Sequence, residues 1–299
     1  MPEESDHWHR WLLQTRFGGD ADNARRELAQ RLYPVRDKVL DNAGLRPQDT
    51  LLDVGAGDGL IAFGALERPG FSGHVIIADV SADLLGHCRQ VAAAREWQDR
   101  CSFILAPADG LSAVTTAMVN VVTTRSVLIY VRDKAAALRE FYRVLAPGGR
   151  ISLGEPINVL MASYDPARFS GYSTADVGEL AAKVQALYEA IQPSGADPMI
   201  DFDDRDLVRH AEEAGFDEVE LELRITVRNR KRPVPWNRFL RTSGNPLVPT
   251  IGEALDRSLS AAEIVAFTAH LRPLVEAGTG QERMAFAFLT ARKDGPDAV

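Results

Sequence analysis

Glycines recur at every second position where one predicted strand turns into a helix. The apolar run 50–54 is followed by Gly55, Gly57 and Gly59. Because glycine has no Cβ, the backbone at Gly55 and Gly57 can pass very close to a ligand. The start of the next helix offers free N–H groups and a positive dipole end to a carboxylate or a phosphate. The spacing argues against a nicotinamide dehydrogenase, since Leu60 stands where the dinucleotide fingerprint G-x-G-x-x-G has its last glycine.

Aspartates lie at the ends of two further predicted strands. Asp79 belongs to the end of the run 74–80, and Asp109 follows the run 101–105. A carboxylate at the end of the second strand can accept charge-assisted hydrogen bonds from both hydroxyls of a ribose. At the third strand end, the carboxylate or its neighbouring backbone could receive an adenine amino group. Because parallel strands end at one edge of a sheet, where open α/β sheets bind ligands, one nucleoside-bearing molecule would satisfy all three sites.

Apolar runs alternate with helical patterns around these motifs. We expect strands at 50–54, 74–80, 101–105, 118–123 and 150–153, with helices after the first, second and fourth. This alternation indicates a parallel sheet covered on both faces. We expect further helices at 21–40 (with Gly44 as a stop), 173–191 and 203–214, and further strands at 218–227 and 284–291.

The pattern predicts three parts of the chain. Residues 1–48 would form a helical cap or lid, and residues 49–228 with 283–293 would form the core. Residues 229–282 would be an insertion before the last strand, either on the substrate side or at an oligomer interface.

Taken as a set, the motifs resemble those of class I S-adenosylmethionine-dependent methyltransferases, closest to the broad ubiquinone/menaquinone-biosynthesis-like, type 11 group. They are DVGAGDG from Asp53, the acidic end of the second strand, the Ala-Asp-Gly at 108–110, and RVLAPGGR before the fifth strand. The resemblance covers residues 51–153 well. It implies a Rossmann-like sheet of seven strands, mostly parallel, whose last strand is antiparallel and lies beside the sixth. It also implies S-adenosylmethionine as cofactor and S-adenosylhomocysteine as product.

The family pattern implies roles for eight residues. The methionine end of the cofactor would meet Asp53, Gly55, Ala56 and Gly57, the ribose would meet Asp79, and the adenine would meet Val80, Asp109 and Gly110. We add Arg125, at the end of the fourth strand, as a candidate for the same site.

The sequence departs from the family after the fourth strand. Many relatives carry V-L-H-H-V there, whereas residues 126–131 of this chain contain no histidine. A base would have to be Tyr130, with Arg125 and Glu155 as further candidates, or there is none. Methyl transfer is an in-line displacement at an activated sulfonium, so holding the nucleophile about 3–3.5 Å away supplies much of the rate. A packed or solvated corner would also explain Arg125 and Tyr130, and helix capping or a salt bridge would explain Glu155 equally well.

Aromatic residues flank the N-terminal helical pattern, at Trp8, Trp11, Phe17 and Tyr33. They could form a lid that excludes water and gives the substrate an apolar wall, or they could simply dock this segment on the sheet. Trp236, near the start of the insertion, is a further candidate for the substrate side.

The formal net charge of −8 argues against binding of nucleic acid or anionic membranes. One basic run departs from this overall negative charge. It comprises Arg224, Arg228, Arg230, Lys231, Arg232, Arg238 and Arg241. Such a run is usually a solvated face, but it could also engage an anionic substrate group or nucleic acid.

Histidines and cysteines show no metal-ligand spacing, so we expect no metal site. Arsenite methyltransferases resemble this group but need several cysteine thiolates, and this chain has only Cys88 and Cys101. The polar N-terminus lacks a signal-peptide core, and no apolar run approaches the ~20 residues of a membrane span.

These observations predict a cytoplasmic methyltransferase of the EC 2.1.1 class. It would transfer a methyl group to an oxygen, nitrogen or carbon nucleophile of a small molecule, and it could form a homodimer. One alternative is a methyltransferase that acts on a peptide, a protein or RNA through the basic insertion. Another is a non-catalytic binding protein that keeps the fold.

Overall fold

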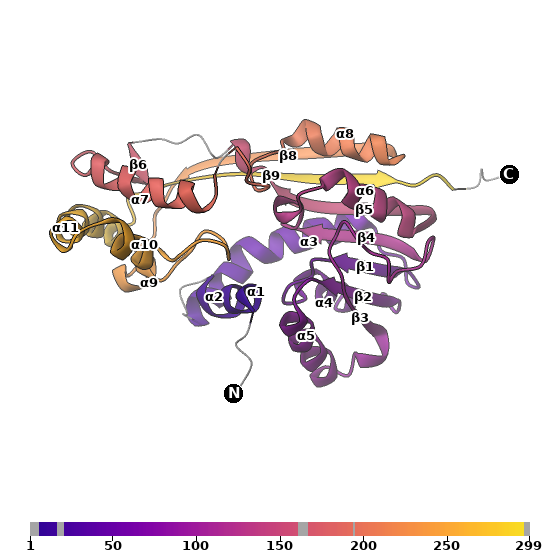
Figure 1. The fold of residues 1–299 in the computed structure, drawn as a ribbon. Coiled ribbons are helices and arrows are strands. Elements are labelled where there is room, and N and C mark those ends of the chain that lie inside the picture. Colours follow the sequence, from indigo (N-terminus) through magenta and orange to yellow (C-terminus); the bar gives the residue numbers. More distant parts are fainter. Residues whose placement is uncertain (1–5, 17–20, 161–166, 194, 296–299) are drawn as a thin grey trace.

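The computed structural model describes residues 6–16, 21–160, 167–193 and 195–295. Its centre is a seven-stranded sheet in the order β3-β2-β1-β4-β5-β9-β8 (Figure 1). The strands are β1 (Thr50–Val54), β2 (His74–Asp79), β3 (Cys101–Leu105), β4 (Val119–Arg125), β5 (Leu145–Pro156), β8 (Asp217–Asn229) and β9 (Gln281–Arg292). Strands β1 to β5 are parallel, and β9 runs antiparallel between β5 and β8. The predicted fold class is therefore confirmed, including the antiparallel last strand beside the sixth.

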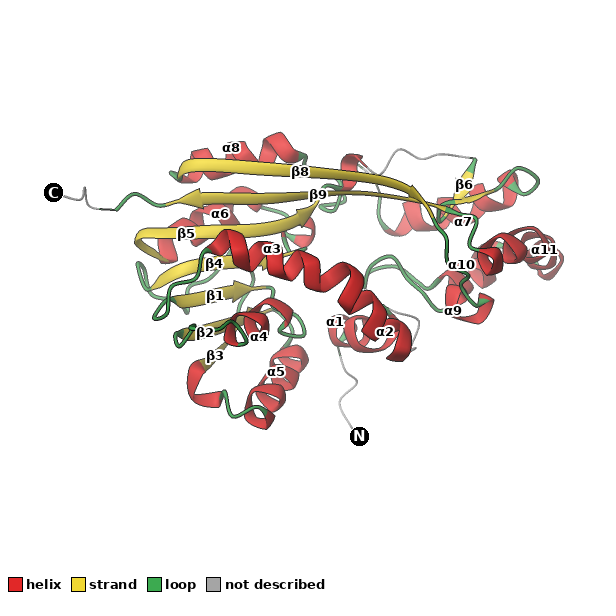
Figure 2. Cartoon of the chain, turned by 180° about the vertical axis from the view of Figure 1, so that it is seen from behind, coloured by secondary structure: helices red, strands yellow, loops and turns green. Residues whose placement is uncertain are grey.

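Side chains of the central strands alternate between two cores, one on each face of the sheet. Leu51, Val75 and Ile77 pack with α3 (Tyr33–Ala43), α4 (Leu60–Leu66) and α5 (Ala82–Ala94). Leu52 and Ile76 pack on the opposite face with α6 (Lys134–Val144) and α8 (Asp204–Ala214). Burial on both faces explains why these strands are apolar throughout, and it fixes their carboxyl ends at one common edge (Figure 2).

Two of the boundaries that differ from the expected ones are those of β5 and of the first long helix. β5 begins at Leu145 rather than 150, so Pro147, Gly148 and Gly149 lie within the strand, where its register with β4 shifts. The helix expected over 21–40 is α2 (Ala21–Glu27), the π-helical turn η2 (Leu28–Leu32) and α3, which ends at Gly44 in the left-handed conformation, as expected.

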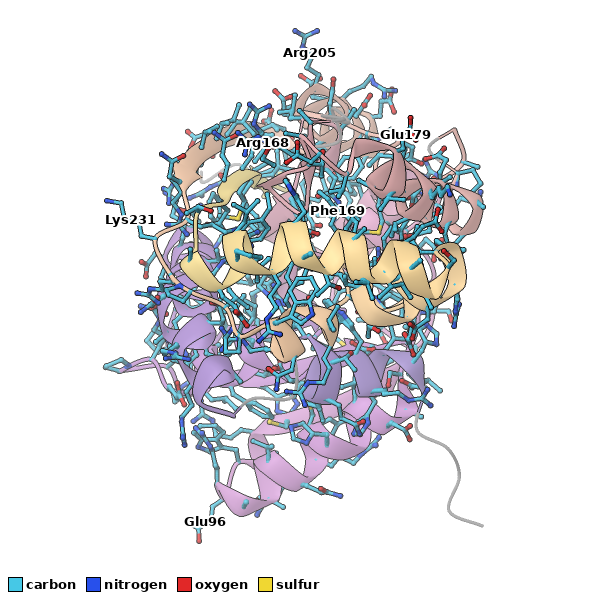
Figure 3. All side chains as sticks on the ribbon, turned by 90° about the vertical axis from the view of Figure 1, so that its left-hand side faces the viewer. Glu96, Arg168, Phe169, Glu179, Arg205 and Lys231 are labelled. Atoms are coloured by element: carbon cyan, nitrogen blue, oxygen red, sulfur yellow. The ribbon has the colours of Figure 1, made fainter. Side chains whose placement is uncertain are left out.

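A second group of helices, with one short hairpin, forms a separate apolar cluster, and we call this group the helical lobe. It lies beyond the end of β8 and the start of β9 (Figures 1 and 3). Its elements are β6 (Arg168–Phe169), β7 (Tyr172–Ser173), α7 (Gly178–Ile191), α9 (Trp236–Leu240), α10 (Ile251–Ser258) and α11 (Ala261–Ala277). Residues 168–191 and the insertion 229–282 thus share one core. Because β6 and β7 form a hairpin first, α7 begins five residues later than expected.

Short elements complete the chain. At the N-terminus lie α1 (His7–Arg10) and the π-helical turn η1 (Trp11–Thr15), and single 3-10 turns occupy η3 (Gln98–Arg100), η4 (Leu128–Tyr130) and η5 (Asn158–Leu160). None of the helices in the described ranges has the length and apolar character needed to cross a membrane.

Candidate functional site

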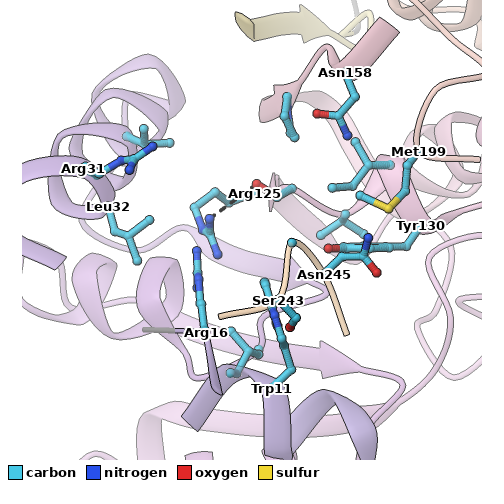
Figure 4. A pocket seen from close by; sticks show the side chains of 18 of the residues that line it. Trp11, Arg16, Arg31, Leu32, Arg125, Tyr130, Asn158, Met199, Ser243 and Asn245 are labelled. Carbon is cyan, nitrogen blue, oxygen red and sulfur yellow. Dashed lines mark hydrogen bonds between the residues drawn. The ribbon is translucent and has the colours of Figure 1, made fainter. Parts of the chain in front are cut away.

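A cavity of about 1290 Å³ opens at the carboxyl ends of β1 to β4 and continues to the helical lobe (Figure 4). Its walls come from the strand ends, from the N-terminal helices, from β8 and β9, and from the lobe. Small-molecule sites usually measure roughly 300–1,000 Å³. This cavity is larger, so it has room for two ligands side by side.

The glycine turn after β1 is held in a conformation that favours glycine. Gly55 and Gly57 have φ angles of +62° and +60°. A Cβ on Gly55 would lie 2.5 Å from Val127 Cγ2, and a Cβ on Gly57 would lie 3.1 Å from Leu12 Cδ1. Both glycines line the cavity, as does Ala56 between them. The turn therefore presents bare backbone to the cavity as a cradle, and a side chain on Gly55 would collide with Val127.

Asp53, on β1, lies directly beneath this turn and is buried. Its Oδ1 accepts a hydrogen bond from Thr123 Oγ1 at 3.0 Å, and its Oδ2 accepts one from the Ala62 amide at 3.0 Å. Burial raises the pKa of Asp53 to about 7, although both hydrogen bonds act to lower it. The carboxyl thus satisfies an amide at the start of α4 and ties β1 to β4 at the cavity wall.

Asp79 joins the end of β2 to the glycine turn. Its Oδ2 accepts a hydrogen bond from the Gly57 amide at 2.8 Å, and its Oδ1 accepts one from the Ser81 amide at 2.9 Å. Burial raises the pKa of Asp79, and these bonds oppose the rise. Each carboxylate oxygen has a second lone pair, so the group can still accept hydrogen bonds from a ligand in the cavity.

Eight of the nine predicted cofactor residues line the cavity. Val80 and Asp109 are exposed within it, at the ends of β2 and β3, and Arg125 reaches it from the end of β4. Gly110 lies outside the lining, where its amide donates to the carbonyl of Pro107 at 3.2 Å and closes a turn.

The N-terminal helices cover the cavity next to Asp79. Asp6 accepts a hydrogen bond from Ser81 Oγ at 2.5 Å, and its amide donates to Asp83 Oδ2 at 2.8 Å. The Trp8 ring meets Tyr130 edge to face, with 4.8 Å between ring centroids. We call residues 6–16, which contain α1 and η1, the N-terminal cover. Trp8, Trp11, Leu12 and Arg16 of this segment line the cavity. The cover therefore spans from the end of β2 to the segment after β4.

Two other candidates for the substrate side lie outside the cavity wall. Tyr33 is partly exposed and has the Arg36 guanidinium 4.4 Å over its ring. Trp236 stacks on Phe239 within the core of the helical lobe. Neither ring lines the cavity, and Phe17 falls outside the described residues.

Glu155 holds the segment that follows β4. It is fully buried and accepts hydrogen bonds from Thr124 Oγ1 at 2.6 Å and from the amides of Val127 and Leu128 at 2.9 and 3.0 Å. Burial raises its pKa to about 7 against the effect of these bonds. Glu155 does not line the cavity, so it acts on the site by positioning Val127, the residue packed against Gly55.

Tyr130 lines the cavity at the end of this segment, on η4. Burial raises its pKa to about 12, although the charges of Arg16 and Arg125 act to lower it. At neutral pH the phenol therefore keeps its proton and can donate a hydrogen bond, but it is poorly suited to remove a proton from a substrate.

The basic run divides into inward and outward residues. Arg224 and Arg228 are four residues apart on β8, so strand alternation turns both toward one face. With Arg230 and Arg238 they line the cavity, whereas Lys231, Arg232 and Arg241 do not. Further lining residues that the sequence did not single out include Arg16, Met199, Ser243 and Asn245 (Figure 4). In the sequence, the even spacing of Arg224 and Arg228 could have indicated that both face one side of a strand. The other lining residues follow no local sequence pattern.

Metal ligands are not clustered in the part of the chain that the structure describes. There, no group of three or more His, Cys, Asp or Glu residues could hold an ion. Cys88 and Cys101 are buried free thiols outside the cavity lining. Burial raises the pKa of Cys88, and it raises that of Cys101 to about 11, so both stay protonated at neutral pH.

Comparisons with known proteins give a family match and several distant relatives. A model of the ubiE/COQ5 methyltransferase family matches residues 30–226. An arsenite methyltransferase of Halobacterium salinarum is 29% identical over 54% of this chain and 42% of its own length. A tRNA 5-carboxymethoxyuridine methyltransferase of Escherichia coli is 34% identical over 41% of this chain and 45% of its own. The match thus spans less than half of either relative.

Solved structures share the fold. Phosphoethanolamine N-methyltransferase 2 of Haemonchus contortus, in complex with S-adenosyl-L-methionine, superposes with a TM-score of 0.50. The match covers 88% of this chain and 53% of that one, at 16% identity. Similarity at this level supports the architecture of the sheet and its flanking helices.

Proposed function

Because this chain belongs to the ubiE/COQ5 methyltransferase family, we propose that it transfers a methyl group from S-adenosylmethionine to an oxygen, nitrogen or carbon atom of a small molecule. The observation that carries the proposal is the cavity itself. It begins at the glycine turn and the Asp79 carboxylate and continues, without leaving the molecule, into a chamber walled by the helical lobe. One end suits a nucleoside-bearing cofactor, and the other leaves room for an acceptor.

The residues at the strand ends fit this cofactor. The cradle at Gly55 and Gly57 would accept its methionine end beside Asp53, and Asp79 would accept hydrogen bonds from its ribose hydroxyls. Val80 and Asp109 would border the adenine. When bound, S-adenosylmethionine supplies a methyl group that its sulfonium has already activated.

We further propose that this chain contributes positioning and exclusion of water rather than a general base. No histidine lies among the described residues of the cavity wall, and Tyr130 holds its proton. The N-terminal cover, with Trp8 and Trp11, would exclude water from the reacting groups. Such a site favours an acceptor whose nucleophilic atom needs no proton removed by the protein.

The direction of the basic side chains supports a small-molecule acceptor over RNA or a protein. Four residues of the basic run line the cavity, so their charges are available to a ligand inside the molecule. An arsenite substrate also gains no support, because both thiols are buried outside the cavity and remain protonated at neutral pH.

A labelling experiment tests the proposal. The protein is incubated with methyl-labelled S-adenosylmethionine and with three fractions of a cell extract: the small-molecule filtrate, the RNA and the protein. We expect label in the filtrate, and none when the variant Asp79→Ala replaces the wild type. Label confined to RNA or protein would overturn the small-molecule proposal. No transfer to any fraction, despite tight cofactor binding, would favour the non-catalytic alternative.

A further inference from the structure

The cavity is cationic although the chain as a whole carries a net charge of −8. Among the described residues its lining has four carboxylates, at Glu27, Asp53, Asp79 and Asp109. The same lining has nine guanidinium groups, at Arg16, Arg31, Arg125, Arg132, Arg168, Arg224, Arg228, Arg230 and Arg238. Three of the four carboxylates belong to the strand ends. Arg31, Arg224 and Arg228 form ion pairs with Glu27, Glu222 and Glu282. With these carboxylates counted, arginines still outnumber acidic groups along the described wall.

The proposed cofactor does not account for this charge. S-adenosylmethionine carries a sulfonium and an ammonium group against one carboxylate, so it is itself a net cation. Surplus guanidinium groups repel such a ligand, and they favour an anion. A second, anionic ligand in the same cavity would balance the positive charge of the arginines and that of the cofactor.

Two of these arginines face each other at the centre of the cavity. Arg125 comes from the end of β4 and Arg16 from the N-terminal cover, and their guanidinium groups point toward one another (Figure 4). Burial, together with the nearby charge of Arg125, lowers the pKa of Arg16 to about 10, although the charge of Asp58 acts to raise it. An anion between the two guanidinium groups would be attracted by both charges.

Unused hydrogen-bond donors lie at the same place. Within the described residues, the Arg125 guanidinium has one hydrogen bond, to Ser126 Oγ at 3.4 Å, and no ion pair. The buried indole Nε1 of Trp11, also in the cavity wall, has no partner. A planar guanidinium matches the two oxygens of a carboxylate or phosphate, and an indole N–H can donate to a third acceptor position.

The surroundings of this pair are apolar and come from outside the cofactor motifs. Leu32, Tyr130 and Met199 stand around it, with Ser243 and Asn245 from the insertion (Figure 4). Phe286 and Phe288 of β9 extend the apolar wall toward the arginines of β8. A ligand that fits such a wall has an apolar body as well as a charged group.

We propose that the methyl acceptor is an organic oxyanion, a small molecule with an apolar body and a carboxylate or phosphate group, which Arg125 and Arg16 bind inside the cavity. This inference rests on the proposed methyltransferase function and adds the chemical class of its substrate. It assigns Arg125 to the acceptor rather than to the carboxylate of the cofactor.

Calorimetry with matched acids and amides tests the assignment. With the protein saturated by S-adenosylhomocysteine, 2-naphthoate is compared with 2-naphthamide, and decanoate with decanamide. The compound 2-naphthyl phosphate distinguishes phosphate from carboxylate. The variants are Arg125→Gln and Arg16→Gln. The control is Arg241→Gln, which makes the same change in an exposed residue of the basic run outside the cavity.

We expect at least one anion to bind the wild type and the control tenfold or more tighter than its neutral partner. In Arg125→Gln the preference should fall below threefold, while affinity for S-adenosylhomocysteine stays unchanged. If Arg125→Gln does not fold, Arg16→Gln gives the same comparison from a segment outside both sheet cores.

Three results would overturn the inference. The first is that no anion binds in preference to its amide in the wild type. The second is that the preference survives in both variants. The third is that Arg125→Gln loses affinity for S-adenosylhomocysteine instead, which would assign the guanidinium to the carboxylate of the cofactor. Failure of the wild type to bind S-adenosylhomocysteine at all would be a failure of the proposed function, and it is measured separately and first.

Discussion

At the scale of single residues, two buried carboxyl groups hold the loops from which the cavity is built. Asp53 ties β1 to β4 and to the start of α4, and Glu155 fixes the segment that packs against Gly55. Burial raises the pKa of each to about 7, because a dry surrounding disfavours the charged form. Neutral carboxyl groups can still accept these hydrogen bonds, so the loops do not require buried charge.

The raised pKa of Glu155 predicts how stability depends on pH. In the unfolded chain the group loses its proton near 4.5, and in the folded chain only near 7. The raised pKa of Glu155 therefore contributes its full stabilisation to the folded state at pH values below about 4.5. This contribution to stability is lost as the pH rises from about 4.5 to about 7. Relative to Glu155→Gln, the free energy of unfolding of the wild type should fall by about 3 kcal/mol across this range, measured by urea denaturation. A constant difference between the two proteins would show that Glu155 is ionised in the folded state.

Gly57 is expected to act on the cofactor as well as on the fold. A Cβ there would enter the gap between the turn and Leu12, and its φ of +60° disfavours any side chain. Gly57→Ala should weaken S-adenosylhomocysteine binding at least tenfold by calorimetry. Gly70→Ala is the matched control, because Gly70 has a φ of +80° but nothing within 4 Å of an added Cβ. Equal affinity in both variants would mean that the turn does not approach a ligand.

At the scale of elements, the N-terminal cover and the sheet meet through a few polar and aromatic contacts. Asp6 binds Ser81 and Asp83 at the start of α5, and Trp8 binds Tyr130, while no residue of the cover belongs to either sheet core. Such an element can open at a low energetic cost without unfolding the sheet. We therefore expect it to control how fast the cofactor leaves.

Asp6→Ala should reveal this control. Losing the bond to Ser81 Oγ should speed the release of S-adenosylhomocysteine severalfold in stopped-flow measurements, with the melting temperature unchanged, because the contact lies outside the cores. The exposed Asp99 provides a control variant, Asp99→Ala. A melting temperature that drops with the release rate unchanged would make the contact structural only.

Local patterns in the sequence were sufficient for the sheet and its ligand edge. Continuous apolar runs and glycine spacing depend on neighbours within a few residues, so the parallel strands and the places of Asp53, Gly57 and Asp79 along them could be predicted. The antiparallel last strand beside the sixth followed only from the family resemblance. The helical lobe could not, because its core joins Phe169 and Val184 to Phe239 and Phe267 across a long stretch of sequence. The same limit explains Tyr33 and Trp236, whose aromatic character suits a packed or stacked position as well as a cavity wall.

At the scale of the whole molecule, the chain combines two differently charged ends in one cavity. The strand ends contribute Asp53, Asp79 and Asp109, and the wall between the N-terminal cover, β8 and the helical lobe contributes arginines. The family match ends at residue 226, so α9 to α11 lie beyond it. We expect these helices to determine which acceptor fits, while the matched part determines the cofactor.

Calorimetric binding of S-adenosylmethionine and S-adenosylhomocysteine, to the wild type and to Asp79→Ala, tests the central claim most directly. We predict micromolar binding to the wild type and to the exposed control Asp99→Ala. Losing charge-assisted ribose bonds should weaken binding to Asp79→Ala by roughly 2–4 kcal/mol, at least tenfold in affinity. No binding to the wild type, or equal binding to wild type and Asp79→Ala, would contradict the assignment of this edge of the sheet to the cofactor.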